Sequence, residues 1–341
     1  MRKLLIAVLG VAVLAGPARA LPDDAYVRLN EAAITQHVQP RYQAFASAVT
    51  ALRSATEVFC KAPAAAGLPA LQQAYRDAAG AWQDIQHVRF GPVELFFRSQ
   101  RIAFWPDSRN TITRQMGDLL AKRDAAAVQP ERLARGSVAV QGLPVLERLF
   151  FVEDAAKLTA GDAEAAFRCR YAEAVAANLE TIARETADEW THVPADGQDM
   201  SLDLFKSLYT AVELIADHKL ARPLGASAAQ ARPRLAEAWR SESSLSHIRH
   251  NLAAALHLYQ VAFRPVLPDT GLNESIQRGF DRSIAAADAI KSPLEEAVAD
   301  PSLRPAAETL AAEVLALKNL LVQKLPPALD LPLGFNALDG D

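Results

Sequence analysis

The feature that most constrains this fold is a repeating pattern of Ala- and Leu-rich stretches, in which apolar residues recur about every 3.6 positions. This spacing gives a helix one apolar stripe that can be buried and one polar face that can stay in water. Runs of alternating Val, Ile, Thr and aromatic residues, as strands require, do not occur. The sequence therefore predicts an all-α protein.

The periodic stretches are long, and Gly and Pro gather in the shorter connections between them. Helices are expected at about 24–60, 68–88, 91–100, 108–124, 142–152, 160–190, 198–221, 228–240, 244–264, 273–298 and 303–325. A polar interruption, THVPADGQ at 191–198, divides the chain near its middle. Because long helices with short connections pack as antiparallel bundles, we expect two bundles, at 21–190 and 191–341.

Residues 1–20 have the composition of a secretory signal peptide. Arg2 and Lys3 precede an apolar run from Leu4 to Leu14, and Ala18-Arg19-Ala20 is a small-x-small cleavage site. The apolar run is too short to span a bilayer, and no later stretch is predicted to be transmembrane. We therefore expect cleavage after Ala20 and export to a bacterial periplasm.

The charge of the chain argues against nucleic acid as a partner. The 341 residues carry a formal net charge of −4, which becomes −7 when the cations Arg2, Lys3 and Arg19 leave with residues 1–20. Binding to a phosphate backbone would require a concentration of positive charge instead.

Only two cysteines are present, Cys60 and Cys169. In an oxidising compartment they could pair and close a long loop. Each also lies in an apolar helical context, where a free buried thiol is common. Two cysteines so far apart do not form a zinc framework. The sequence leaves the disulfide and the two free thiols as alternatives.

The common catalytic signatures are missing from this sequence. It contains no His-Glu-x-x-His, no Gly-x-Ser-x-Gly, no phosphate-binding Gly-rich loop and no Cys-x-x-Cys. His247 and His250 lie three apart on one face of an expected helix and could share a metal, but further ligands would have to come from elsewhere. Histidines at the polar edge of an amphipathic helix also need no metal. Asp107, before an expected helix, is typical of an N-cap.

The stretch QGLPVLERLF, at 141–150, could simply start a buried helix. Pro144 in the first helical turn loses no hydrogen bond, because the N–H groups of that turn have no partner within the helix. Glu147, about one turn in, faces the positive end of the helix dipole. Apolar residues on both sides of Glu147 complete a stripe for burial.

Several short segments, taken together and in order, resemble one family. RFGP, FWPD, GLPVLERLFF, KLARPLG, SHIRHNL and the C-terminal LGFNALDGD are similar to segments of the imelysin-like proteins. Those are exported bacterial proteins, historically classed as metallopeptidases and now linked mainly to iron uptake. The resemblance covers essentially the whole mature chain. It implies two helical bundles related by a pseudo-twofold axis, with a site in the cleft between them.

The resemblance also gives QGLPVLERLF a second interpretation. The corresponding family motif is Gly-x-His-x-x-Glu, whose His and Glu could together hold a metal. Gly142 and Glu147 match this motif, but Pro144 stands in place of the His and has no lone pair to donate. Glu147 is then expected to anchor the cleft, paired with Arg89 or another cation. The remaining metal candidates, Glu147, His247 and His250, are weak.

The prediction is therefore a non-catalytic, periplasmic imelysin-like protein that binds a ligand in the inter-bundle cleft during iron acquisition. The expected cleft residues are Arg89, Trp105, Asp107, Glu147, Lys219, Asn251 and Asp339. The alternatives are a metallopeptidase using Glu147, His247 and His250, and an interaction module of an iron-uptake assembly. The resemblance suggests iron as a cofactor and other envelope proteins as partners, without an intact metal motif to support the iron.

Overall fold

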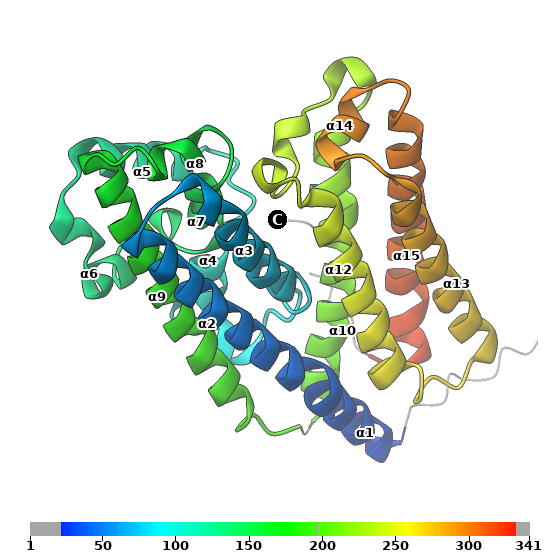
Figure 1. Ribbon diagram of the computed structural model, residues 1–341. Helices are drawn as coiled ribbons and strands as arrows, with labels where there is room; N and C mark the ends of the chain where they lie inside the picture. The colour runs from blue at the N-terminus through cyan, green and yellow to red at the C-terminus, as the bar shows by residue number, and fades with distance from the viewer. Residues whose placement is uncertain (1–21, 196, 332–341) are drawn as a thin grey trace, which may run out of the picture.

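The computed structural model describes residues 22–195 and 197–331, and within these ranges the chain forms helices and no strands (Figure 1). The all-α prediction is thereby confirmed. Residues 1–20 and Asp339 lie outside the described residues. No helix in the described ranges is long and apolar enough to cross a membrane.

The first half of the chain forms a group of helices built on α2, α3 and α9 (Figure 1). Along α2, apolar side chains recur three or four residues apart, at Tyr42, Phe45, Val49 and Leu52, and all four are completely buried. This stripe faces α9 and α3, and shorter helices close the remaining sides. The helices are α2 (Gln39–Lys61), α3 (Leu68–Gln83), α4 (Arg98–Ile102), α5 (Thr111–Lys122), α6 (Pro130–Ala134), α7 (Leu143–Phe150), α8 (Glu153–Leu158) and α9 (Ala163–Trp190).

The second half forms a bundle of four long helices with two short helices at one end (Figure 1). Its strongest pairing is between α13 and α15, with α10 and α12 completing the bundle. The helices are α10 (Gln198–Glu213), α11 (Ala221–Leu224), α12 (Ser244–Leu258), α13 (Thr270–Ala289), α14 (Leu294–Ala299) and α15 (Arg304–Ala328). A π-helical turn at 214–220 joins α10 to α11, and another at 259–263 follows α12.

The first helix of the described chain, α1 (Asp23–Ala33), packs on the second group although it precedes the first. Asn30 donates to the carbonyl oxygen of Gly197 at 2.8 Å and accepts from the Ser201 hydroxyl at 2.7 Å. A π-helical turn at 34–38 then leads into α2. Helices α3 and α12 also touch, so one continuous set of buried apolar side chains runs through both groups. The pseudo-twofold relation and the domain boundaries stay predictions.

Cys60 and Cys169 form a disulfide, with their Cα atoms 5.4 Å apart. The bond joins the C-terminal end of α2 to the first turns of α9, the two helices that form the main contact of the first group. Of the two alternatives that the sequence leaves open, the structure contains the bridged one.

Three helix predictions need correction. The expected helix 91–100 is a 3₁₀ stretch at 91–97 that is interrupted by non-helical backbone at Leu95 and Phe96, and α4 begins only at Arg98. The segment 228–240 is not a helix but a series of short 3₁₀ turns at 228–230, 233–235 and 239–241. Pro233 disfavours the α conformation of the residue before it and has no N–H for a helical hydrogen bond. The expected helix 273–298 breaks into α13 and α14 at Lys291-Ser292-Pro293, for the same reason.

Candidate functional site

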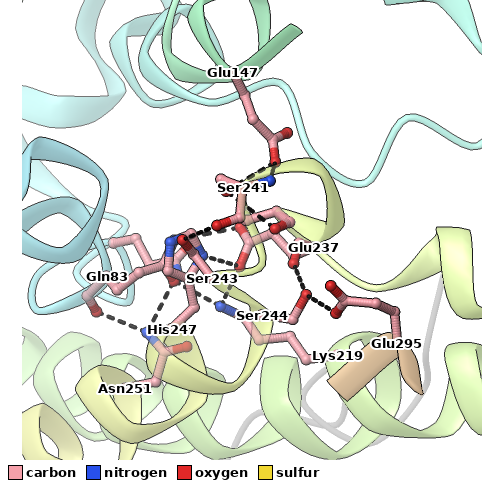
Figure 2. Close-up of polar contacts among 12 residues, drawn as sticks. Gln83, Glu147, Lys219, Glu237, Ser241, Ser243, Ser244, His247, Asn251 and Glu295 are labelled. Carbon is pink, nitrogen blue, oxygen red and sulfur yellow. Dashed lines mark hydrogen bonds and ion pairs between the residues drawn. The ribbon is translucent and has the colours of Figure 1, made fainter. Parts of the chain in front are cut away.

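A buried polar network lies where the two groups of helices meet (Figure 2). Lys219 enters from the π-helical turn at 214–220, and its ammonium group donates to Glu237 Oε2 at 2.5 Å and to Gln83 Oε1 at 2.6 Å. His247, on α12, places Nδ1 3.1 Å from the same Glu237 oxygen. The side chain of Lys219 is 1% exposed and that of Glu237 is 10% exposed. Burial of a charged pair is tolerable only with such complete partnering.

The electrostatics of the network favour an ionised Glu237. Burial alone would raise the pKa of this carboxyl group, but Lys219 and His247 hold its pKa well below the ordinary value. Burial lowers the pKa of Lys219, and the neighbouring Glu237 opposes that effect. The network is therefore an ion pair that connects the second group to Gln83 at the end of α3.

Asn251, one helical turn after His247, fixes the end of α3. Its Nδ2 donates to the backbone oxygen of Gln83 at 2.7 Å and to Gln83 Oε1 at 3.2 Å. Its Oδ1 and the Nε2 of His247 are both buried without a hydrogen-bond partner in the described chain. His247 and Trp82, whose Nε1 is also unpartnered, line a cavity of about 40 Å³, enough space for a water molecule.

Glu147, on α7, forms a second polar connection between the groups (Figure 2). It is buried, and its Oε1 accepts hydrogen bonds from the backbone N–H of Ser241 at 3.1 Å and from the Ser241 hydroxyl at 3.0 Å. Burial raises the pKa of Glu147, although Arg240 and Ser241 partly offset the effect. The prediction that Arg89 pairs with Glu147 is wrong. The Nε of Arg89 donates to the backbone oxygen of Gln86, and its side chain is exposed.

The residues of the family motif do not fit a metal ion in this chain. Pro144 is the second residue of α7 and offers no ligand atom, and Ser241 already donates two hydrogen bonds to Oε1 of Glu147. The histidines face different partners, because His247 contacts Glu237 while His250 Nδ1 lies 2.9 Å from Asp84. Among the side chains that the structure describes, no three of His, Cys, Asp or Glu come together in a way that could hold a metal. The candidates Glu147, His247 and His250 therefore do not form one metal site.

A larger pocket of about 450 Å³ opens beside Glu147 and is lined by both groups of helices. One wall of the pocket consists of segment 105–113, Pro144, Glu147 and Arg148. The other wall consists of Arg222 and segment 234–240. The volume lies within the usual range for small-ligand sites. The pocket lies between the two groups of helices, where the resemblance implies a cleft, and we call it the junction pocket.

The expected cleft residues divide between the junction pocket and its surroundings. Trp105, Asp107 and Glu147 line the pocket. Lys219 does not line the pocket, but its ammonium lies 5.8 Å from the centre of the ring of Trp105, which does, and Asn251 belongs to the buried network. Asp107 accepts hydrogen bonds from the backbone N–H groups of residues 111 and 112, so it caps α5 as the sequence predicts. Arg89 does not line the pocket.

Sequence reasoning missed several residues of the site, namely Gln83, Arg148, Glu237, Trp239, Arg240 and Ser241. The last four belong to or follow segment 228–240, where a helix was expected and the structure has 3₁₀ turns. Pro233 and the sequence EAWRSESS at 237–244 are the signals that could have revealed an irregular segment there.

Comparisons with known proteins identify the family of this chain. The model of the imelysin family matches residues 38–321. The chain belongs to the imelysin family. Iron-regulated protein A of Synechococcus elongatus (strain ATCC 33912 / PCC 7942 / FACHB-805) is 23% identical over 318 residues, which cover 86% of this chain and 84% of that protein.

Two solved structures share the fold of this imelysin-family protein. An imelysin-like protein from Psychrobacter arcticum 273-4 superimposes with a TM-score of 0.79 at 21% identity, covering 93% of this chain and all (100%) of the other. An iron-regulated protein A precursor from Parabacteroides distasonis ATCC 8503 gives a TM-score of 0.67 at 14% identity, covering 89% and 97%. At these identities the two structures establish the fold.

Proposed function

We propose that this imelysin-family protein is exported to the bacterial periplasm and binds a small ligand in the junction pocket, without catalysis, as part of iron acquisition. The observation that carries the proposal is the pocket itself, about 450 Å³ in volume and lined by both groups of helices. Two features support the cellular role: the signal-peptide composition of residues 1–20 and the similarity to a protein named iron-regulated protein A.

The chemistry of the pocket wall favours binding over peptide hydrolysis. A metallopeptidase of this family would need a ligand at the position of Pro144 and a free Glu147 carboxylate. In this chain Pro144 has no donor atom, and Glu147 accepts two hydrogen bonds from Ser241. Casein hydrolysis by the purified protein should therefore be absent, with and without a chelator. Hydrolysis that a chelator abolishes would support the peptidase alternative.

The binding role is tested by filling the junction pocket. Thr113 is an exposed residue of α5 on the pocket wall, so a Thr113→Trp substitution should occupy part of the pocket with little effect on the core. Thr309→Trp, on the exposed face of α15 and away from the pocket, is the matched control. The gene for each variant would be introduced into a bacterial strain from which the wild-type gene has been deleted, and the strain would then be grown in iron-chelated medium.

Growth of the deletion strain under iron limitation should be impaired and should be restored by the wild-type gene and by Thr309→Trp, but not by Thr113→Trp. Equal rescue by both variants would mean that the pocket is not used. Normal growth of the deletion strain would remove iron acquisition from the proposal.

Osmotic-shock fractionation should release the protein with Leu21 at its N-terminus, whereas retention in the cytoplasm would contradict export. Envelope proteins of an iron-uptake system are the partners we propose, and cross-linking in the same strain would identify them.

A further inference from the structure

The walls of the junction pocket carry four arginines that have no ionic partner in the described chain. Arg148 comes from α7, and Arg222, Arg234 and Arg240 come from the second group. Among the side chains that the structure describes, which leave out those of residues 23 and 153, none of the four forms a salt bridge within 4.0 Å or a side-chain hydrogen bond, although eighteen salt bridges occur elsewhere. A chain of net charge −4 thus places four unpaired cations around one pocket.

The nearby carboxylates are occupied by other groups. Asp107 lines the pocket, but both of its oxygens accept hydrogen bonds from the first turn of α5. Glu147 is buried against Ser241. Asp154, close to the same pocket wall, pairs with Lys157 at 2.8 Å and with Arg168 at 3.2 Å. The positive charge of the pocket therefore has no full counterpart in the described chain.

The arginines also act on one another across the pocket. Burial lowers the pKa of Arg240 to about 10, and the charge of Arg148 lowers it further in the same direction. The Nε of Arg148 is buried and has no hydrogen-bond partner. Both effects cost free energy, because the buried Nε has no acceptor and the two cations repel each other, and the charges of Glu147 and Asp154 oppose these effects only in part.

Aromatic contacts hold two of the four arginines in place. The guanidinium of Arg240 lies 4.3 Å from the centre of the Trp239 ring, and that of Arg234 lies 5.3 Å from it. An arginine held on an aromatic face keeps its N–H groups directed outward and loses less rotamer freedom when it binds. A guanidinium offers a planar pair of donors that matches a carboxylate or a phosphate.

We propose that the junction pocket binds a small polyanion, a polycarboxylate or a phosphate-bearing molecule, through Arg148, Arg234 and Arg240. This inference rests on the proposed function, because it names the chemical class of the ligand for the same pocket. One carboxylate or phosphate group would leave most of the four positive charges unmatched, so the ligand carries at least two negative charges.

Calorimetric titration of the full mature chain tests the proposal, with citrate, inorganic phosphate and glycerol as separate probes. Citrate or phosphate should bind and glycerol should not, and binding should weaken as NaCl is raised, because salt screens charge. Arg148→Gln and Arg240→Gln should each weaken binding by about tenfold or more, the size expected for a lost charge-assisted hydrogen bond. Arg240→Lys keeps the charge and should recover part of the affinity.

The control variant is Arg278→Gln, which removes an arginine from a different cavity where it already pairs with Glu274 at 3.2 Å. Binding of citrate alone would identify the ligand as a polycarboxylate, and binding of phosphate would identify a phosphate-bearing one. No binding of either anion by a folded wild-type protein, or equal affinity in wild type, Arg148→Gln and Arg240→Gln, would overturn the inference. Circular dichroism of each variant shows whether it is folded. Arg240→Lys tests the role of the positive charge, because it keeps the charge on a side chain of similar length.

The growth experiment separates this inference from the proposed function. If Thr113→Trp fails to support growth in iron-chelated medium and neither anion binds, the pocket is used but its ligand is not a polyanion. If the anions bind through the arginines while Thr113→Trp supports normal growth, the polyanion site stands and the iron-acquisition role fails.

Discussion

Replacing Lys219 by Met would test how strongly the buried ion pair stabilises the junction between the two groups of helices. The substitution keeps the volume of the side chain and removes the ammonium that lies 2.5 Å from Glu237 and 2.6 Å from Gln83. Glu237 is then left with His247 at 3.1 Å and Gln83 Nε2 at 3.4 Å. Breaking a buried pair by removing one partner typically costs about 3–5 kcal/mol.

The structure also sets a limit to this cost. In the variant, Glu237 can lose its charge by taking up a proton. For a carboxyl group of ordinary pKa 4.5, protonation at pH 7 costs about 3.4 kcal/mol, because each pH unit corresponds to about 1.36 kcal/mol. We therefore expect Lys219→Met to lower the free energy of unfolding by about 3 kcal/mol at pH 7. Lys318→Met is the matched control, because Lys318 pairs with Asp217 at 2.6 Å near the surface. Its cost should be about 0–1 kcal/mol.

The pH dependence gives a second test of the same pair. In the wild type the folded-state pKa of Glu237 is depressed, so its stabilising contribution is present above the ordinary value of 4.5 and is lost as the pH falls below it. In Lys219→Met the carboxyl accepts a proton more readily, so the variant loses less stability on acidification. The difference between the two proteins should therefore shrink as the pH falls from 7 to 4.

Urea unfolding, followed by circular dichroism and tryptophan fluorescence, measures both effects. Lys219→Met with Glu237→Gln should recover much of the lost stability, because no unpaired charge remains buried. A loss below about 1 kcal/mol at pH 7, equal to that of an exposed pair, would refute the reasoning, as would a loss that does not change between pH 7 and pH 4.

Four further predictions concern other parts of the molecule. Gly142→Ala should reduce the free energy of unfolding by at least about 2 kcal/mol, because an added Cβ would lie too close to backbone carbonyl oxygens at a φ of +74°; urea unfolding would show it. Thiol titration of the denatured, unreduced protein should find Cys60 and Cys169 blocked, and two reactive thiols would contradict the disulfide. Burial lowers the pKa of His87 to about 3, so between pH 6.5 and pH 5 the unfolded state takes up a proton that the folded state does not. The free energy of unfolding of the wild type should therefore fall by about 2 kcal/mol over this range because of this group. His87→Gln should show a flatter dependence of stability on pH. Wild type should bind Fe(II) and Zn(II) no better than Glu147→Ala in calorimetric titration, and tight binding lost in the variant would show that an intact metal site exists.

The parts of this structure that could be predicted are those that local spacing determines. The 3.6-residue period placed α2 and α9, and Pro144 was correctly expected in the first turn of a buried helix. Asp107 was expected to cap the helix that follows it, and its carboxylate does accept two first-turn N–H groups, although the N-cap position itself is Asn110. In each case the evidence lies within a few residues of the feature.

The parts that could not be predicted depend on contacts between distant segments. Glu147 was expected to meet a cation, but its partner Ser241 lies 94 residues later and contributes a backbone N–H, which any residue except proline could supply. Glu237 lies in segment 228–240, which was expected to form one helix, and the structure instead folds this segment into short turns and places Glu237 against Lys219. No local pattern specifies such pairings.

Gly142 and Glu147, the two motif residues that this chain retains, have structural roles that explain their presence without a metal. Gly142 adopts a φ of +74°, and a Cβ there would come within 2.3 Å of the backbone oxygen of Ile102, so only glycine fits. Glu147 accepts two hydrogen bonds from Ser241 and so joins α7 to the second group of helices. The His position has no such duty: Pro144 fills it as a helix-starting residue and lines the junction pocket with an apolar ring. A Pro144→His substitution would therefore introduce an imidazole beside a Glu147 carboxylate whose hydrogen bonds hold the two groups together. Metal binding by that variant would have to compete with Ser241, and it should loosen the junction that the wild-type contact closes.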